Sequence, residues 1–327
     1  RILFVALLAA SAAAQHGPFT KDFVKFLMKD EFNVFALNSY KEFGVNGTFG
    51  GKAKDEEMVL SHQPVLFIHG NSDSALYYSA VTFQTGWSAS VEYFKSRGFK
   101  GFELYGLTYG TRNMSQAADN SITCRNLVGI RRFIEAILLY TQAKKIDIVA
   151  HSMGVSLARK AVQGGRVQLT NETCELGQSI AHKVDALVAI AGANYGMCLC
   201  LNDAYIKTPS CSQQGFTPGT CGKTPITKES CEQQNGCEKN DYSSILQQIN
   251  GDDKEAAFIA SLWSLKDNVL GDNSRAWGRI TSDVPDSDFK HAYENHTHFQ
   301  MKDLTCQDQY NLVTRHSLHG RRAEWEY

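Results

Sequence analysis

One stretch of the chain, residues 144–162, reads KKIDIVAHSMGVSLARKAV and changes its character in the middle. The residues from Ile146 to Ala150 are mostly apolar, which is typical of a strand buried on both faces. After Gly154 the apolar side chains recur at helical spacing. The stretch therefore predicts a strand, a sharp turn at Ser152 and a helix. Such a turn can present a nucleophilic serine, whereas the alternative is a serine that only caps the helix.

Short apolar runs alternate with helical patterns along most of the chain. Strands that are apolar on both faces and alternate with helices predict an α/β fold, with a mostly parallel sheet covered by helices on both faces. The predicted strands are residues 65–68, 101–110, 146–150, 184–194 and 256–264, and the predicted helices include residues 90–99, 120–142 and 302–316.

The first residues look like a targeting segment. A basic residue, an apolar run and small residues predict a secretory signal peptide over residues 1–14, and the alternative is a buried N-terminal helix. The chain does not begin with methionine, so we expect it to be trimmed at its start. Residues 15–60 are expected to form an N-terminal extension packed on the core, and residues 61–327 the main α/β domain. Residues 195–242 are rich in Cys, Gln, Thr and Gly and predict an insertion stapled by disulfides.

Cysteine usage also predicts a secreted, extracellular protein. Six of the nine cysteines lie between Cys198 and Cys237, as expected for disulfides formed in an oxidising compartment. Because nine is odd, one thiol is expected to be free or paired with another chain. Four glycosylation sequons point the same way, at Asn46, Asn113, Asn171 and Asn295.

Composition and charge exclude several classes of partner. The formal net charge is −1, so nothing favours binding to nucleic acid or to an anionic membrane surface. Outside the N-terminal segment, no stretch approaches the roughly 20 apolar residues of a membrane helix. We expect a monomer without a transmembrane segment.

The segment around Ser152 fits a nucleophile elbow. An elbow needs small residues two positions before and two after the serine, and Ala150 and Gly154 meet that requirement. Acyl transfer also needs two backbone N–H groups directed at the developing oxyanion. One would come from Met153, and the other from Asn71, which follows a His-Gly pair at the end of the first predicted strand.

An acid and a base should follow later in the chain. Asp267 comes just after the apolar run 256–263 and is the candidate acid. A loop before the closing helix favours His296 or His298 as the base. A His-x-His pair could instead bind a metal, but no third ligand stands out, so we expect neither a metal nor a cofactor. The other histidines after Asp267 are His291, His316 and His319, and the other aspartates considered are Asp241, Asp252, Asp253, Asp283, Asp286 and Asp288.

Four segments of the chain carry a family resemblance: AKKIDIVAHSMG, VLFIHGNSDS, IAGANYG and SLWSLKDNV. They resemble the class 2 lipases, which include small secreted bacillar lipases and secreted nematode relatives. The resemblance to the nematode branch runs from GTFGGK to NLVTRH and includes the Cys-rich insertion, whereas the bacillar one is confined to the core. It implies an α/β-hydrolase fold, Ser152 as nucleophile, Asp267 as acid, His298 as base, and Asn71 and Met153 as oxyanion donors.

The chain departs from the family pattern beside the histidine. The family's segment reads Thr-His-Asp-Gln-Thr-Lys-Asp, and here it is THFQMKD, so Phe299 and Met301 differ. These departures keep the base but alter its immediate surroundings, and with them the fit of a substrate.

The resemblance implies hydrolysis of carboxylic esters of lipids, as in a triacylglycerol lipase or esterase, through an acyl-enzyme and at a lipid–water interface. One alternative is a secreted protein without catalysis that keeps the fold to bind lipid or a partner. The other is a thioesterase, amidase or acyltransferase that uses the same triad. The complete order Ser…Asp…His favours an enzyme, and the insertion has too few consecutive apolar residues to predict an amphipathic lid.

Overall fold

A seven-stranded sheet forms the centre of the computed structural model, which describes residues 16–318 apart from 30–32, 80–82, 223–225, 234–236, 238 and 239. The strand order is β1-β3-β2-β4-β7-β8-β11, and all neighbours are parallel except β1 with β3. The mostly parallel sheet is thus confirmed. The strands are β1 (Thr48–Phe49), β2 (Val65–Ile68), β3 (Leu104–Leu107), β4 (Ile146–His151), β7 (Val184–Ile190), β8 (Phe258–Ser264) and β11 (Phe289–Tyr293).

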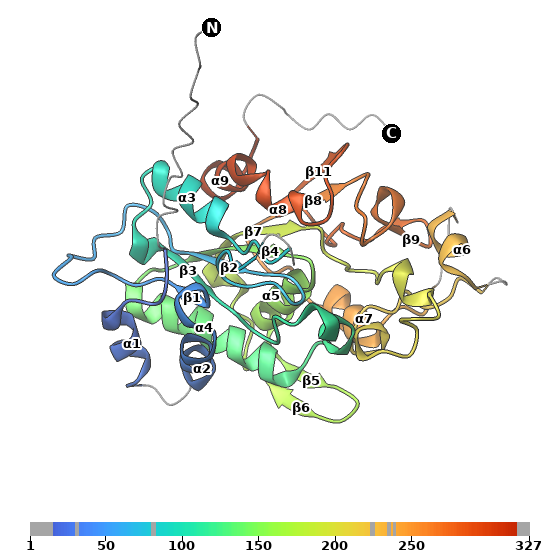
Figure 1. Ribbon diagram of the computed structural model, residues 1–327, viewed down its shortest axis with the longest axis horizontal. Helices are drawn as coiled ribbons and strands as arrows, with labels where there is room; N and C mark the ends of the chain where they lie inside the picture. The colour runs from blue at the N-terminus through green and yellow to red at the C-terminus, as the bar shows by residue number, and fades with distance from the viewer. Residues whose placement is uncertain are drawn as a thin grey trace, which may run out of the picture.

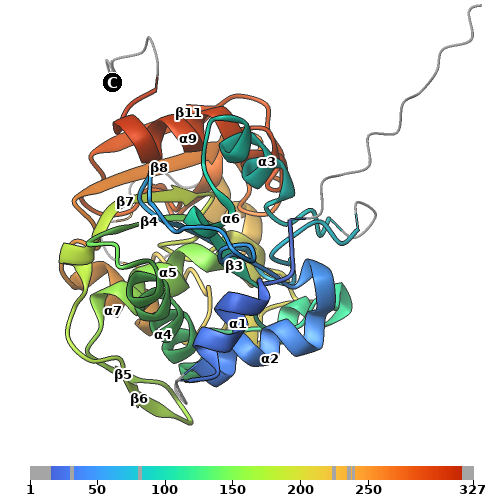
Figure 2. The same cartoon turned by 90° about the vertical axis from the view of Figure 1, so that its left-hand side faces the viewer.

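Helices cover both faces of this sheet, as predicted for an α/β-hydrolase (Figure 1). Helices α3 (Ser88–Ser96) and α9 (Cys306–Arg315) lie on one face, and α4 (Cys124–Thr141) and α5 (Met153–Gln163) lie on the other. Figure 2 shows the same arrangement from the side. Strand β4 is buried along its whole length, because it has helices on both faces and strands on both edges.

The N-terminal helices α1 (Lys21–Leu27) and α2 (Val34–Phe43) lie against α4. Phe23 of α1 is fully buried, and its ring centroid lies 5.3 Å from that of Tyr105 in β3 and 4.7 Å from that of Tyr140 in α4. Aromatic pairs at this separation stabilise a contact beyond the area they bury. The predicted division at residue 60 stays a prediction, and the predicted signal peptide lies outside the described residues.

The sequence pattern found the interior strands better than the edges. Strand β2 has the predicted bounds, while β3 and β7 are shorter than predicted. The pattern missed β1 and β11. Every residue of β11 is only partly buried, because β11 forms an edge of the sheet and contains Lys290 and His291. An edge strand of this composition lacks the continuous apolar run that identifies a buried strand.

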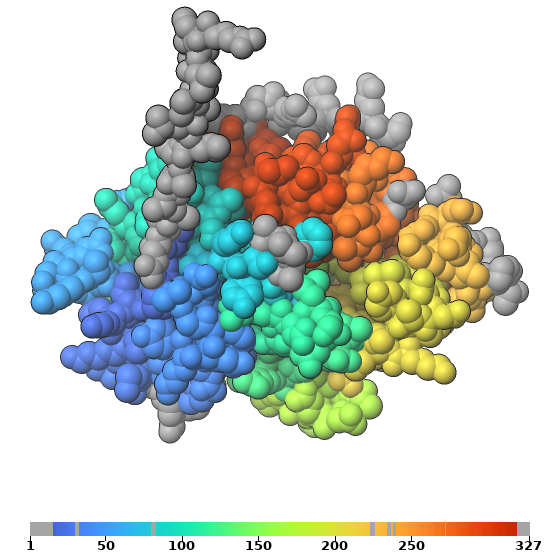
Figure 3. Space-filling model, in the orientation of Figure 1, coloured from blue at the N-terminus to red at the C-terminus, as the bar shows by residue number. Residues whose placement is uncertain are grey.

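The Cys-rich insertion joins β7 to β8 and forms one end of the molecule, yellow in Figure 3. It contains the 3₁₀ helices η6 (Cys198–Leu201) and η7 (Pro209–Cys211) and helix α6 (Lys228–Gln233), and α7 (Ser244–Gly251) follows it. Its six cysteines pair among themselves, as predicted, and Cys306 in α9 is the free thiol. The disulfides are Cys198–Cys231, Cys200–Cys211, Cys221–Cys237 and, outside the insertion, Cys124–Cys174.

The remaining strands are short. Strands β5 (Arg166–Gln168) and β6 (Thr173–Glu175) form one hairpin, and β9 (Arg275–Ala276) pairs with β10 (Arg279–Ile280). Within the described ranges, none of the helices combines the length and the apolar character needed to cross a membrane.

Candidate active site

The turn between β4 and α5 places Ser152 in a conformation that L-residues rarely adopt, with φ of 55° and ψ of −127°. Its backbone N–H donates a hydrogen bond to the carbonyl oxygen of Ile190 in β7, at 2.9 Å. The Ser152 side chain makes no capping hydrogen bond to α5, so the helix-capping alternative is wrong. The strained turn instead leaves Ser152 partly exposed at the end of the strand.

Close backbone approach explains the small residues around this turn. A Cβ atom on Gly154 would clash with the carbonyl oxygens of Ile68 and His69 at the end of β2. A Cβ atom on Gly70 would lie 2.9 Å from the Cβ of Ser152. The elbow and the loop after β2 therefore pack directly on each other, which only glycine allows at these two positions.

Asp267 and His298 meet in the structure. The Oδ2 atom of Asp267 lies 2.7 Å from Nδ1 of His298, and both side chains are almost fully buried. A carboxylate only accepts hydrogen bonds, so Nδ1 carries a proton, and in the neutral tautomer of this ring Nε2 is the nitrogen that can accept one. Asp267 follows β8 and His298 follows β11, so these residues, Ser152 and Asn71 all follow the carboxyl ends of parallel strands. That edge of an open α/β sheet is where ligands bind.

The environment of Asp267 keeps it charged. Burial acts to raise the pKa of Asp267, but His298 and the backbone N–H groups of Leu270 and Val269 together lower the pKa below its usual range. Both N–H groups donate to Oδ1 at 2.8 Å. A carboxylate ionised at neutral pH can orient a neutral imidazole and stabilise it once protonated.

Several of the competing histidines and aspartates have other partners. The ring of His296 stacks on Tyr293 at 5.0 Å, and His316 lies 3.2 Å from Asp185. His319 is outside the described residues. No set of three His, Cys, Asp or Glu side chains within residues 16–318, as far as they are described, could hold a metal ion. Three of the other aspartates form ion pairs with lysines: Asp252 with Lys160, Asp283 with Lys290 and Asp288 with Lys254.

His69 fixes the loop that carries Asn71. Its Nε2 accepts the backbone N–H of Tyr109 at 3.1 Å, so Nδ1 must be the protonated nitrogen, and Nδ1 donates to the Gly70 carbonyl at 2.7 Å. Burial lowers the pKa of His69 to about 4, which keeps the ring neutral. Because the C=O and N–H of one peptide unit point in opposite directions, this bond also sets the direction of the Asn71 N–H.

The side chain of Asn71 ties this loop to a neighbouring segment. Its Nδ2 donates to the carbonyl oxygen of Ala117 at 2.8 Å, and its Oδ1 accepts from Asn120 at 2.5 Å. Ala117 belongs to the 3₁₀ helix η4 (Met114–Asp119). Met153 is the first residue of α5, where backbone N–H groups have no partner within the helix and can bind an anion.

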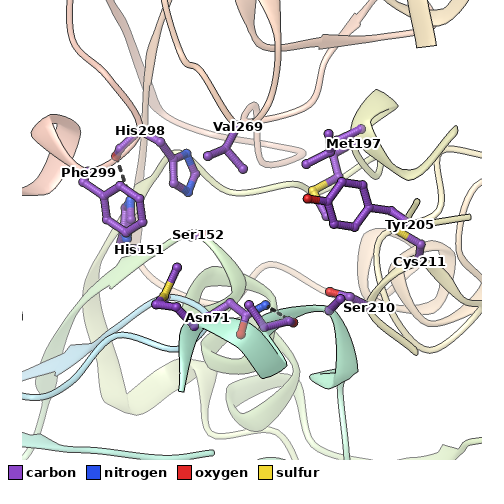
Figure 4. Close-up of a pocket in the computed structure, with 15 residues that line it drawn as sticks. Asn71, His151, Ser152, Met197, Tyr205, Ser210, Cys211, Val269, His298 and Phe299 are labelled. Carbon is purple, nitrogen blue, oxygen red and sulfur yellow. Dashed lines mark hydrogen bonds between the residues drawn. The ribbon is translucent and has the colours of Figure 1, made fainter. Parts of the chain in front are cut away.

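These groups face a cavity of about 230 Å³, drawn in Figure 4. Ser152 and His298 both line it, and most of the other lining side chains are apolar. Phe299, which departs from the family pattern, also lines the cavity, while Met301 is fully buried and does not line it. The remaining lining residues are Gly70, Asn71, Met114, Ala117, Ala118, His151, Met197, Leu199, Tyr205, Ser210, Cys211 and Val269.

Sequence reasoning missed the position of His151. Its Nε2 donates to the backbone carbonyl of His298 at 3.0 Å, and the two ring centroids lie 4.7 Å apart. Burial and the nearby His298 hold the pKa of His151 well below its usual range, so the ring is neutral. The only available signal was its place beside Ser152, which does not reveal a contact with a residue 147 positions away.

Comparisons with known proteins identify the family of this chain. The family model described as "Lipase (class 2)" matches residues 62–311. Among solved structures, Aspergillus fumigatus lipase B is 12% identical with a TM-score of 0.41, covering 84% of this chain and 59% of that one. This chain thus spans about 59% of the length of that lipase.

Two further solved structures are similarly distant. A chain described under LipS and LipT, two metagenome-derived lipolytic enzymes, is 12% identical with a TM-score of 0.44, covering 78% of this chain and 95% of that one. Pyrococcus horikoshii acylaminoacyl peptidase is 12% identical with a TM-score of 0.44, and the match covers 85% of this chain and 40% of that one. A comparison with curated proteins found no match. Because the family model covers most of the chain, this protein belongs to the class 2 lipase family.

Proposed function

We propose that this protein is a secreted serine hydrolase that cleaves carboxylic esters of lipids through an acyl-enzyme on Ser152. One observation carries the proposal: His298, held by the buried Asp267 at 2.7 Å, lines the same cavity as a serine on a strained strand-to-helix turn. A nucleophile and a base in one cavity, with an acid that orients the base, are what acyl transfer requires.

The proposed reaction has two halves. The Ser152 hydroxyl attacks the ester carbonyl while Nε2 of His298 takes its proton, and the N–H groups of Asn71 and Met153 bind the oxyanion. The intermediate then collapses, the C–O bond to the alcohol breaks, and His298 returns the proton to the leaving alcohol. In the second half His298 deprotonates a water molecule, which attacks the carbonyl of the acyl-enzyme; the bond to Oγ of Ser152 then breaks, His298 returns the proton to Oγ, and the acid leaves. None of these steps needs a cofactor.

Apolar lining supports lipid esters as the substrate class. The acyl group of such an ester can bury its chain among side chains such as Met114, Leu199 and Val269. Exposed apolar side chains, among them Met114 and Tyr205, continue this surface to the outside, as expected for work at a lipid–water interface.

Secretion is the second part of the proposal. Four disulfides are typical of proteins that fold in an oxidising compartment. Three of the sequon asparagines, Asn113, Asn171 and Asn295, are exposed and so accessible to glycosylation. A mass shift of the protein secreted from eukaryotic cells, reversed by peptide N-glycosidase, tests this part.

The experiment that tests the activity uses two readouts on the purified protein. Hydrolysis of p-nitrophenyl esters measures turnover, and a fluorophosphonate probe labels an activated serine, which mass spectrometry then locates. We expect both turnover and labelling at Ser152. A folded protein that shows neither would be a binding protein on a hydrolase fold.

Replacing Asp267 with asparagine is expected to lower kcat by about 10⁴-fold. An amide at this position donates as well as accepts, so it no longer holds the proton on Nδ1 of His298 and cannot stabilise the protonated ring. Steady-state kinetics on an ester measure the loss. Asp286→Asn is the matched control, because Asp286 is an exposed loop residue of the same type. An unchanged rate in Asp267→Asn would assign the acid to another carboxylate.

Replacing His151 with phenylalanine is expected to lower kcat by about tenfold with little change in KM. The ring is kept, but the carbonyl of His298 loses a buried donor, and a net hydrogen bond contributes about 1 kcal/mol. His151 thus acts as a positioning residue for the base. A loss purely of thermal stability, with kcat intact at low temperature, would reduce its role to packing.

A further inference from the structure

The Cys-rich insertion builds one wall of the cavity, beside η4. Figure 4 shows Tyr205 and Met197 across the cavity from His298 and Ser152. The adjoining wall is the η4 segment, whose Ala117 carbonyl is held by the Asn71 side chain. The insertion residues that line the cavity are Met197, Leu199, Tyr205, Ser210 and Cys211.

The loop that carries Tyr205 is held in place on both sides. The Cys200–Cys211 disulfide closes it at its base, and both of these cysteines are buried. Within the loop, the Tyr205 N–H donates to the Asn202 carbonyl at 2.8 Å, and the Tyr205 carbonyl accepts from the Thr208 backbone at 2.9 Å and hydroxyl at 2.8 Å. The backbone of Tyr205 is therefore fixed even though its side chain is 39% exposed.

The insertion is also tied to the adjoining η4 wall. The backbone N–H of Ile122, just before α4, donates to the Gln214 carbonyl at 2.9 Å, and η7 contacts η4 directly. Within the insertion, the Met197 N–H donates to the Phe216 carbonyl at 2.9 Å. The insertion and the η4 segment are thus fixed relative to each other. The size of the cavity that they line therefore depends on the side chains that enter it.

Tyr205 is the bulkiest insertion side chain in this space. Its ring lies across the cavity from the nucleophile, and its hydroxyl points inward in Figure 4. No hydrogen-bond partner for this hydroxyl is found among the described residues. At about 230 Å³ the cavity is smaller than the roughly 300–1,000 Å³ typical of ligand pockets. Figure 4 places the ring of Tyr205 in the direction that an acyl chain takes when it extends from Ser152 toward the insertion.

We propose that Tyr205 limits the length of the acyl chain, so that the enzyme favours short and medium acyl esters over long ones. This inference rests on the proposed function. It assigns to the insertion a role in substrate selection, because the ring blocks further extension of the chain between the two walls.

The test compares kcat/KM for p-nitrophenyl acetate, butyrate, octanoate and palmitate. In Tyr205→Ala we expect the ratio of palmitate to butyrate to rise by about tenfold or more, since added apolar contact raises kcat/KM by this order. Tyr205→Trp, which enlarges the ring, should lower the ratio of octanoate to butyrate. Tyr205→Phe keeps the ring and should keep the original profile.

Ile206→Ala is the matched control, because Ile206 is the next residue of the loop, is 47% exposed and does not line the cavity. It should leave the profile unchanged. An unaltered profile in both Tyr205→Ala and Tyr205→Trp overturns the inference. A shift in Ile206→Ala as large as that in Tyr205→Ala also overturns it, because the loop would then simply be loosened. A shift of that size in Tyr205→Phe overturns it too, because the effect would then belong to the hydroxyl. If the parent protein cleaves no ester at all, the proposed function itself fails.

Discussion

Replacing Ser152 with alanine is expected to lower kcat for the hydrolysis of a p-nitrophenyl ester by about 10⁶-fold, because no other group can form the acyl-enzyme. The residual rate of hydrolysis should be only the rate that the folded protein supports once it has no nucleophile. Fluorophosphonate labelling should vanish together with turnover, and circular dichroism should show an unchanged fold, since the alteration removes one oxygen from a partly exposed side chain.

Ser156→Ala is the matched control for this variant. Ser156 lies in α5, one turn after Ser152, and its hydroxyl is buried without a hydrogen-bond partner in the described structure. Its removal should leave kcat within a few-fold of the parent. Turnover of purified Ser152→Ala within about tenfold of the parent would reject Ser152 as the nucleophile.

Replacing His298 with alanine is expected to be as severe, with a loss of about 10⁶-fold in kcat, because base and nucleophile act as a unit. The geometry gives the reason: Asp267 holds the proton on Nδ1, which leaves Nε2 to take the proton of Ser152. The double variant Ser152→Ala with His298→Ala should be no slower than either single variant.

His296→Ala is the control that the chain itself offers, two residues away in the same loop. His296 stacks on Tyr293, at 5.0 Å between ring centroids, so its loss should change kcat only slightly. A severe loss in His296→Ala together with a mild one in His298→Ala would move the base to His296.

The buried strands of the fold could be predicted from local patterns of apolar residues in the sequence. The strand at 65–68 and the strand–turn–helix around Ser152 were predicted because buried parallel strands are continuous apolar runs, which stand out between polar loops. The edge strands of the sheet could not be predicted in this way. Strand β11, only partly buried, carries Lys290 and His291, and it is recognisable only through its pairing with β8.

The candidate site divides in the same way. Residue types and order pointed to Ser152, Asp267 and Asn71, because each follows a predicted strand, while the residues alone left His296 and His298 open. The resemblance to the class 2 lipases favoured His298, and the structure shows that it is the one in contact with Asp267. The catalytic roles of these residues remain predictions that the variants above test.

Sequence by itself determined the parallel sheet, the sharp turn at Ser152 and the presence of a disulfide-stapled insertion, since all three depend on the spacing of residue types along the chain. Tertiary structure alone decided that the Ser152 side chain makes no capping hydrogen bond, that His151 holds the carbonyl of His298, and that Tyr205 faces Ser152 across the cavity. The last two depend on segments far apart in the chain, which the strand order β4-β7-β8-β11 and the packing of the insertion beside η4 bring to one cavity.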